Sequence, residues 1–402
     1  MTVTTAATSH RTPTRHRPGF ALAVAAVVAM MVGASAPSPF YPVLQQEIGF
    51  SAATMTAIFA VYAVALLLTL LVAGSLSDHL GRRPVVSAGF VVLALSMVAF
   101  WHADTVTVLV SARVVQGVAA GLLMSSLSAA VVDLEPPSRP GSAATLNSVS
   151  PLAGLALGAL VAGALLDRTS SALAVVFGAL TAVYVLVAAA VWLLPETSPR
   201  HEGLMGSFVP RVGLPAAARA PFLRSAPALF AGWATSGLYL SLGAPLAGGE
   251  LGAERHVEQG LVVAVLTGVG ALTCYIARGQ TSRRLTIMGT TALAIGTALT
   301  LGALAIGSYW SFIAAAVIAG VGFGSSFLGI MRSITPLAAP HERGELFASV
   351  FVISYLAFGI PAVAAGIASA HVGLAETTYV YGGAVVVLSA SAALLRRFGS
   401  DD

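Results

Sequence analysis

Lysine is absent from this chain of 402 residues, and charge of either sign is scarce. Only 9% of the residues are charged and 57% are hydrophobic, whereas roughly 25% of a typical soluble domain is charged. Together with a mean hydropathy of +0.89, this composition excludes a soluble enzyme. The arginines stand singly or in pairs between apolar runs, so they form no basic patch for nucleic acid.

Cysteine is nearly absent as well, since Cys274 is the only one and lies in an apolar stretch. A single cysteine excludes a disulfide framework, a paired-thiol redox motif and a Cys-rich metal site. The sequence also lacks a nucleotide-binding glycine loop, a catalytic-triad spacing and a cluster of metal ligands. We therefore expect no enzyme activity, no cofactor, no metal and no ATP-driven step.

Long apolar runs are what the chain does contain. A membrane-spanning helix needs about 20 mostly apolar residues, and runs bounded by charge, Pro or Gly predict twelve spans of that kind. They cover residues 19–46, 52–76, 84–102, 105–131, 143–166, 171–194, 226–247, 258–278, 286–307, 310–331, 346–370 and 376–395.

The first run imitates a secretory signal, because arginines precede it and the small residues Ala34-Ser35-Ala36 follow it. The helical pattern continues through Tyr41 and Leu44, however, which favours a retained first helix over cleavage. With this helix starting inside the cell, 17 of the 20 arginines fall on the side of the termini; the other three are Arg113 in a span and Arg168 and Arg255 outside. This asymmetry predicts that both termini are cytoplasmic, in a multi-pass protein of the cytoplasmic (inner) membrane.

The middle of the chain divides it into halves that repeat each other. A shift of 203 residues superposes Gly117 on Gly320, Gly121 on Gly324 and Gly163 on Gly366. Parallel repeats of this kind are typical of transporters whose substrate site lies between the halves. We expect an all-α membrane protein with 12 transmembrane helices in two pseudo-symmetric six-helix bundles, organised as a tail (1–18), a bundle (19–194), a linker (195–225), a bundle (226–395) and a tail (396–402).

The loop after the second span is the most specific motif in the chain. It reads Gly74-Ser75-Leu76-Ser77-Asp78-His79-Leu80-Gly81-Arg82-Arg83-Pro84, which resembles the signature cytoplasmic loop of the major facilitator superfamily. We expect a conformational switch loop in which Gly74 lets helices approach closely, Asp78 accepts hydrogen bonds or faces a helix N-terminus, Gly81 turns the chain, and Arg82 and Arg83 anchor to the inner leaflet. The alternative is an ordinary positively charged cytoplasmic loop.

The fourth span carries a charge within the membrane. Arg113 and Gln116 lie on one helix face and are followed by Gly117 and Gly121, which resembles a second motif of the same family. A charge in a span is costly, so we expect Arg113 and Gln116 to serve the cavity or the coupling of transport, and the two glycines to pack helices. The alternative for Arg113 is a structural bond or snorkelling to an interface.

Small residues recur in the fifth span. Gly154, Gly158 and Gly163 are expected to pack helices, and their spacing resembles the family's antiporter motif. Ala159 and Ala162 replace a proline and a glycine of that motif, which weakens the antiporter assignment. Pro195-Glu196-Thr197 also resembles the family's exit from the first half.

Polar amides are rare in the spans, which disfavours a sugar as substrate. The candidate interior offers aromatic and hydroxyl groups instead, which suit an amphipathic or aromatic compound. Packing is the alternative role for each of them. The candidate substrate-binding residues are Ser38, Tyr41, Asn147, Trp233, Tyr239, Phe323, Phe327, Phe351 and Tyr355.

The resemblance is to the twelve-helix drug and metabolite efflux group, and it implies a monomeric secondary transporter that exchanges a small molecule for protons by alternating access. The residues themselves offer only peripheral proton carriers, namely Asp78, Glu47 and Asp104, with Arg113 as a partner. Two alternatives stay open: uptake of a small organic solute, and a membrane sensor that transports nothing.

Overall fold

The computed structural model describes residues 16–198, 200–208, 210, 212–339 and 342–398. Regular structure in these ranges is helical throughout. Eleven stretches are long and apolar enough to cross a membrane, and a further long helix, α10 (Ala216–Gly249), accompanies them. The all-α membrane fold predicted from the apolar runs is confirmed.

The first half holds six long helices that pack as neighbours. Helix α6 packs against α3 and α5, α5 against α8, and α1 against α7. Their bounds are α1 (His16–Ser35), α3 (Ala52–Ala73), α5 (Arg82–Trp101), α6 (Val106–Asp133), α7 (Ser142–Leu166) and α8 (Ala172–Ala190), with the short α2 (Tyr41–Ile48), α4 (Leu76–Leu80) and the 3-10 turns η2 (Ser38–Phe40) and η3 (Val191–Leu193) between them.

The second half repeats this arrangement after the short helix α9 (Leu204–Ser207). Helix α13 packs against α11 and α12, α12 against α15, and α10 against α14. Besides α10, its elements are α11 (His256–Ile276), η4 (Ala277–Gly279), α12 (Ser282–Ala305), α13 (Tyr309–Ile334), η5 (Thr335–Leu337), α14 (Arg343–Val372) and α15 (Leu374–Phe398).

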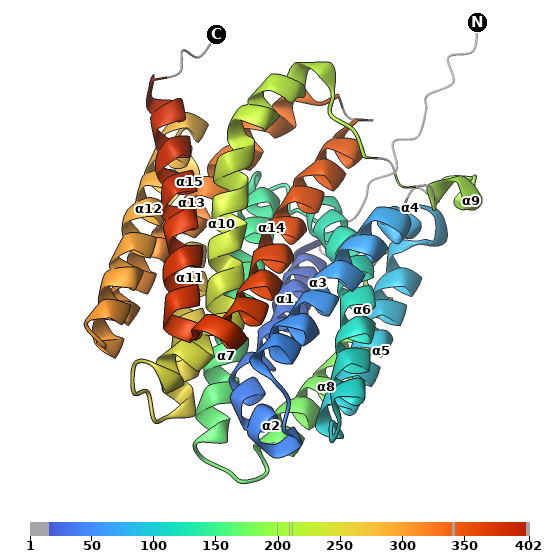
Figure 1. Cartoon of the computed structure of the whole chain (residues 1–402). Helices are drawn as coiled ribbons and strands as arrows, with labels where there is room; N and C mark the ends of the chain where they lie inside the picture. Colours follow the sequence, from blue (N-terminus) through green and yellow to red (C-terminus); the bar gives the residue numbers. More distant parts are fainter. Residues whose placement is uncertain (1–15, 199, 209, 211, 340–341, 399–402) are drawn as a thin grey trace, which may run out of the picture.

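Two helix pairs join the halves. Helix α7 lies along α11, and α3 lies along α14. Figure 1 shows α12, α13 and α15 on one side of the molecule and α5, α6 and α8 on the other, with α3 and α14 between them. Helices α4 and α9 and the end of α15 lie at one end, here called the termini end, and α2 lies at the opposite end.

The helix ends differ in places from the expected bounds. The first span is not continuous, because Pro37 and Pro39 interrupt it between α1 and α2 with the turn η2. The predicted linker is shorter than 195–225, since α10 already begins at Ala216. Helix α1 begins at His16, two residues before the predicted end of the N-terminal tail, and α15 continues to Phe398.

Helix α10 is not among the eleven apolar stretches, and much of it is covered by protein. It packs against α11, α13, α14 and α15, so it needs little surface that suits lipid. Two of its hydroxyl groups are bonded within the helix: Thr235 Oγ1 donates to the Ala231 carbonyl at 2.8 Å, and Ser241 Oγ to the Gly237 carbonyl at 2.6 Å.

Candidate functional site: a switch loop, a buried arginine and an aromatic cluster

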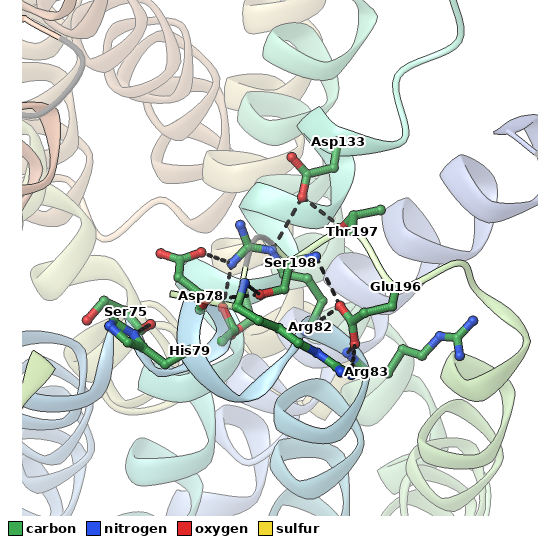
Figure 2. Close-up of polar contacts among 12 residues, drawn as sticks. Ser75, Asp78, His79, Arg82, Arg83, Asp133, Glu196, Thr197 and Ser198 are labelled. Atoms are coloured by element: carbon green, nitrogen blue, oxygen red, sulfur yellow. Dashed lines mark hydrogen bonds and ion pairs between the residues drawn. The ribbon is translucent and has the colours of Figure 1, made fainter. Parts of the chain in front are cut away.

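The switch loop is tied to two distant parts of the first half (Figure 2). Asp78 forms an ion pair with Arg82, whose Nη1 also donates to Ser77 Oγ at 2.7 Å. Arg82 Nε reaches Asp133 Oδ2 at 3.3 Å, at the last residue of α6. Only 12% of the Arg82 side chain is exposed. Arg82 therefore joins three elements and is not a lipid anchor, which corrects the expectation.

The acid that faces a helix N-terminus is Glu196, not Asp78. Its carboxylate accepts hydrogen bonds from the backbone N–H of Arg82 at 2.8 Å, Arg83 at 3.3 Å and Ser198 at 3.1 Å. Burial raises the pKa of Glu196, but these bonds and the nearby charge of Arg200 outweigh it and lower the pKa. The ionised carboxylate thus fixes the start of α5, where the helix dipole favours negative charge.

Two glycines of the loop serve different purposes. Gly81 has φ +111°, a conformation that side chains other than glycine rarely adopt, so it permits the turn from α4 into α5. Gly74 was expected to admit a second helix, but the atoms nearest to a Cβ at this position belong to Leu70 of its own helix. Gly74 ends α3 and does not mediate helix packing.

The buried arginine of α6 is held by the end of the first helix. Arg113 Nε donates to the Tyr41 hydroxyl, and Nη1 donates to Gln116 Oε1 at 2.6 Å and to the Ala34 carbonyl at 3.4 Å. Gln116 Nε2 donates to the Gly33 carbonyl at 2.7 Å. The break between α1 and α2 thus places Tyr41 and the Ala34 carbonyl at the guanidinium, and the Gly33 carbonyl at Gln116.

Aromatic rings complete the surroundings of Arg113. Its guanidinium carbon lies 5.3 to 5.8 Å from the ring centroids of Tyr41, Phe59, Tyr62 and Phe100. Arg113 is fully buried, and its Nη2 has no hydrogen-bond partner. None of the ion pairs between described residues includes Arg113. The charge is therefore balanced by dipoles and π faces rather than by an acid.

Most of the predicted aromatic residues meet in one cluster, here called the aromatic cluster. Trp233 of α10 lies at its centre, with ring centroids 6.3 Å from Phe323, 6.0 Å from Phe327 and 5.3 Å from Tyr355. Phe351 lies 6.3 Å from Tyr355. The Trp233 indole Nε1 is buried and has no hydrogen-bond partner.

The aromatic cluster reaches the first half through residues that sequence reasoning missed. Phe358 lies 6.1 Å from Trp233 and 5.0 Å from Phe59 of α3. The Tyr355 hydroxyl lies 3.5 Å from Met124 Sδ of α6. The spacing of Phe351, Tyr355 and Phe358 places all three on one helix face, so Phe358 could have been predicted. No sequence pattern indicates that Phe59 packs against Phe358. The cluster thus lies where the two halves meet.

Besides Tyr41, which bonds Arg113, three of the predicted substrate residues lie outside the aromatic cluster. Tyr239 is fully buried inside the second half, where its hydroxyl bonds Thr300 Oγ1 at 2.6 Å. Asn147 Nδ2 donates to the Ser128 carbonyl at 3.1 Å and so joins α7 to α6. Ser38 Oγ donates to the Leu240 carbonyl at 3.2 Å, across the two halves. These three side chains are occupied by structural bonds.

The five packing glycines all lie against another helix. A Cβ at Gly117 or Gly121 would come within 2.7 Å of α3, and one at Gly154 within 2.6 Å of α1, which Gly158 also faces. A Cβ at Gly163 would lie 2.6 Å from the His256 carbonyl oxygen of α11, in the other half. Small residues at these positions allow the backbones to touch.

A polar latch, formed by Asp167, His256 and Val257, joins the two halves at the end opposite the termini. Asp167 follows α7, and its Oδ1 and Oδ2 accept from the backbone N–H groups of His256 at 2.8 Å and Val257 at 2.9 Å. The His256 ring adds a contact at 3.0 Å. Burial raises the pKa of Asp167, but these bonds outweigh it and lower the pKa. The sequence shows an acid directly after the fifth span, but it does not indicate that this acid bonds the start of α11.

In the parts of the chain that the structure describes, no three His, Cys, Asp or Glu side chains gather as metal ligands would. The site therefore consists of a peripheral ion-pair network, a buried cation and an aromatic cluster between the halves.

The chain is similar in sequence to a known protein family and to parts of two known proteins. The family model described as Major Facilitator Superfamily matches residues 22–294, more than half of the chain. The quinolone resistance protein NorA of Staphylococcus aureus is 24% identical over 98 residues, 24% of this chain and 25% of that protein. The uncharacterized MFS-type transporter Rv1250 of Mycobacterium tuberculosis is 33% identical over 125 residues, 30% of this chain and 22% of that protein. The chain thus spans about a quarter of the length of each relative. It belongs to the Major Facilitator Superfamily of secondary transporters, as its signature loop predicts.

Proposed function

We propose that this transporter exports small amphipathic aromatic compounds in exchange for protons, with both termini in the cytoplasm. The observation that carries the proposal is the aromatic cluster between the halves, whose central Trp233 has a buried indole N–H without a partner. Buried donors are nearly always bonded, so this N–H is suited to an acceptor on a bound compound. The stretch shared with a quinolone resistance protein supports the same substrate class.

The proposed direction of transport rests on the orientation of the latched end, and the proposed coupling rests on the surroundings of Arg113. Asp167 bonds the two halves to each other at the end opposite the termini, so we infer that in the proposed orientation this state receives compounds from the cytoplasm. Glu47 of α2 and Asp104 of the α5–α6 connection are exposed at the latched end, and Asp78 is paired with Arg82. Arg113 packs on the ring of Phe59, which in turn contacts Phe358 beside the aromatic cluster. We therefore assign Arg113 to coupling, together with Gln116 and Tyr41.

Dye accumulation in cells tests export against the two alternatives. Cells that express the transporter should accumulate less of a fluorescent cationic aromatic dye than cells without it, and an uncoupler should abolish the difference. Increased accumulation would indicate uptake, and an unchanged level would indicate a protein that does not transport the dye. Trp233→Leu keeps an apolar side chain but removes the aromatic ring and the N–H donor, and should restore dye accumulation at equal protein levels.

Thiol labelling tests the orientation. In a Cys274→Ser background, a cysteine at exposed Asp104 should react in intact cells with an impermeant reagent, and a cysteine at exposed Arg200 should react only after lysis. The reverse pattern would refute the cytoplasmic termini, and with them the proposed direction.

A further inference from the structure

A basic groove opens on the outer face of the second half at the termini end. It has a volume of about 740 Å³ and lies along α12, with contributions from α13 and α15. Three arginines line it: Arg283 and Arg284 at the start of α12, and Arg397 at the end of α15. No acidic side chain of the described residues lines this groove. Its electrostatic preference is therefore for an anion.

The arginines stand at one end of an apolar stripe. Arg284, Met288, Thr291 and Ile295 follow one another on a single face of α12, and all four are exposed. At 1.5 Å per residue, the path from Arg284 to Ile295 is about 16 Å long. Half of a bilayer's hydrocarbon core is about 15 Å thick. The stripe therefore matches the depth of one leaflet.

The headgroup end is preorganised. Arg283 Nη2 donates to the Arg397 carbonyl at 3.4 Å, which holds the start of α12 beside the end of α15. Arg284 Nη1 donates to Gln280 Oε1 at 3.0 Å, and a guanidinium has further N–H donors for a phosphate. Guanidinium groups recognise phosphate oxygens by paired hydrogen bonds.

We propose that this groove binds an anionic phospholipid, with its phosphate on Arg283, Arg284 and Arg397 and one acyl chain along Met288, Thr291 and Ile295. Basic pockets between transmembrane helices take the headgroups of such lipids. The site is separate from the aromatic cluster and does not depend on the transported compound.

Native mass spectrometry of the purified full chain tests the site, with equal amounts of dioleoylphosphatidylglycerol and dioleoylphosphatidylcholine added. The protein should retain the anionic lipid in preference to the zwitterionic one. In the variant Arg283→Gln/Arg284→Gln/Arg397→Gln, the fraction of protein that retains the anionic lipid should be at least fivefold lower than in the parental protein. Arg278→Gln removes an exposed arginine at the same end that does not line the groove, and should leave retention unchanged.

A second variant tests the acyl-chain stripe without altering charge. Thr291→Phe fills the groove below the arginines and should lower retention at least threefold, with monodisperse protein as the folding control. Excess glycerol 3-phosphate should not displace the lipid, since it lacks the acyl chain. Equal retention of both lipids, parental retention by both variants, or displacement by glycerol 3-phosphate would overturn the proposal.

Discussion

At the scale of single residues, Arg113 has the most demanding environment. We predict that Arg113→Lys lowers transport at least tenfold in protein that still folds. A lysine has no planar fork and cannot donate at once to Tyr41, Gln116 and the Ala34 carbonyl. Each buried group left without its partner costs about 1–3 kcal/mol.

Dye export by purified protein in liposomes measures this effect. Arg139→Lys makes the same exchange at an exposed position of the α6–α7 connection and should keep the parental rate. Near-parental export by Arg113→Lys would reduce Arg113 to a packing residue.

Glu196 gives a prediction about pH. Its pKa is lowered in the folded protein, so its stabilising effect is fully present above the pKa of an unfolded glutamate, about 4.3, and is lost as pH falls through the lower folded value. We expect Glu196→Gln to lower the melting temperature in detergent by a constant amount from pH 7 to pH 5. The difference should shrink only below about pH 4. A difference that fades between pH 7 and pH 5 would contradict this.

The residue types of the site could be predicted from the sequence, but only some of their partners could. Arg113 and Gln116 are one helical turn apart, so their contact follows from spacing alone. Asp133 is the last residue of α6, where the negative end of the helix dipole is unfavourable for an acid. The sequence therefore indicates that a cation lies beside Asp133. That this cation is Arg82 depends on how α5 and α6 pack, which no local pattern encodes.

At the scale of helices, the repeat predicts equal behaviour of paired glycines. A Cβ at Gly117 would lie 2.6 Å from the Tyr62 carbonyl oxygen, and one at Gly320 would lie 2.6 Å from the Leu266 carbonyl oxygen. We predict that Gly117→Ala and Gly320→Ala each destabilise the protein by about 1–3 kcal/mol, as overpacking does.

Melting temperature in detergent compares these variants with Gly302→Ala, where a Cβ meets nothing within 4 Å. The control should melt at the parental temperature or slightly above it, because alanine favours a helix more than glycine does. A control that is as damaged as the paired variants would show that close packing at Gly117 and Gly320 does not explain their loss of stability.

The positions of the helices were more predictable than their interruptions. Apolar runs locate membrane helices well, because lipid demands continuous apolar side chains. The break at Pro37 and Pro39 lies inside such an apolar run. A count of apolar residues therefore does not reveal that the helix is interrupted there. The early start of α10 at Ala216 was hidden by Arg219 and Arg224, two exposed charges that a helix emerging from the membrane tolerates.

At the scale of the whole molecule, the latch at Asp167 joins the two halves at the end opposite the termini. We predict that Asp167→Ala opens this end, since it removes the acceptors of two backbone N–H groups of α11. A cysteine at buried Ser38, in a Cys274→Ser background, should then react at least fivefold faster with an impermeant thiol reagent. Glu250→Ala changes an exposed acid at the same end and should leave the rate unchanged; equal rates in both variants would remove Asp167 from the latch.

The meeting of the two halves was the least predictable feature of the molecule. The repeat of glycines indicates that the halves are alike, but it does not say which faces touch. Phe59 and Phe358 are nearly 300 residues apart and meet only because α3 lies along α14. The latch has the same origin, since α7 lies along α11.

Proton-driven transport of an aromatic compound is the central claim, and reconstituted liposomes with an acidic lumen test it most directly. Protons leaving the lumen should drive ethidium inward, and collapse of the pH gradient should stop its accumulation. Trp233→Leu should lower the initial rate at least fivefold in monodisperse protein. Accumulation that equals that of empty liposomes, or that is the same with and without the pH gradient, would contradict proton-coupled export through the aromatic cluster.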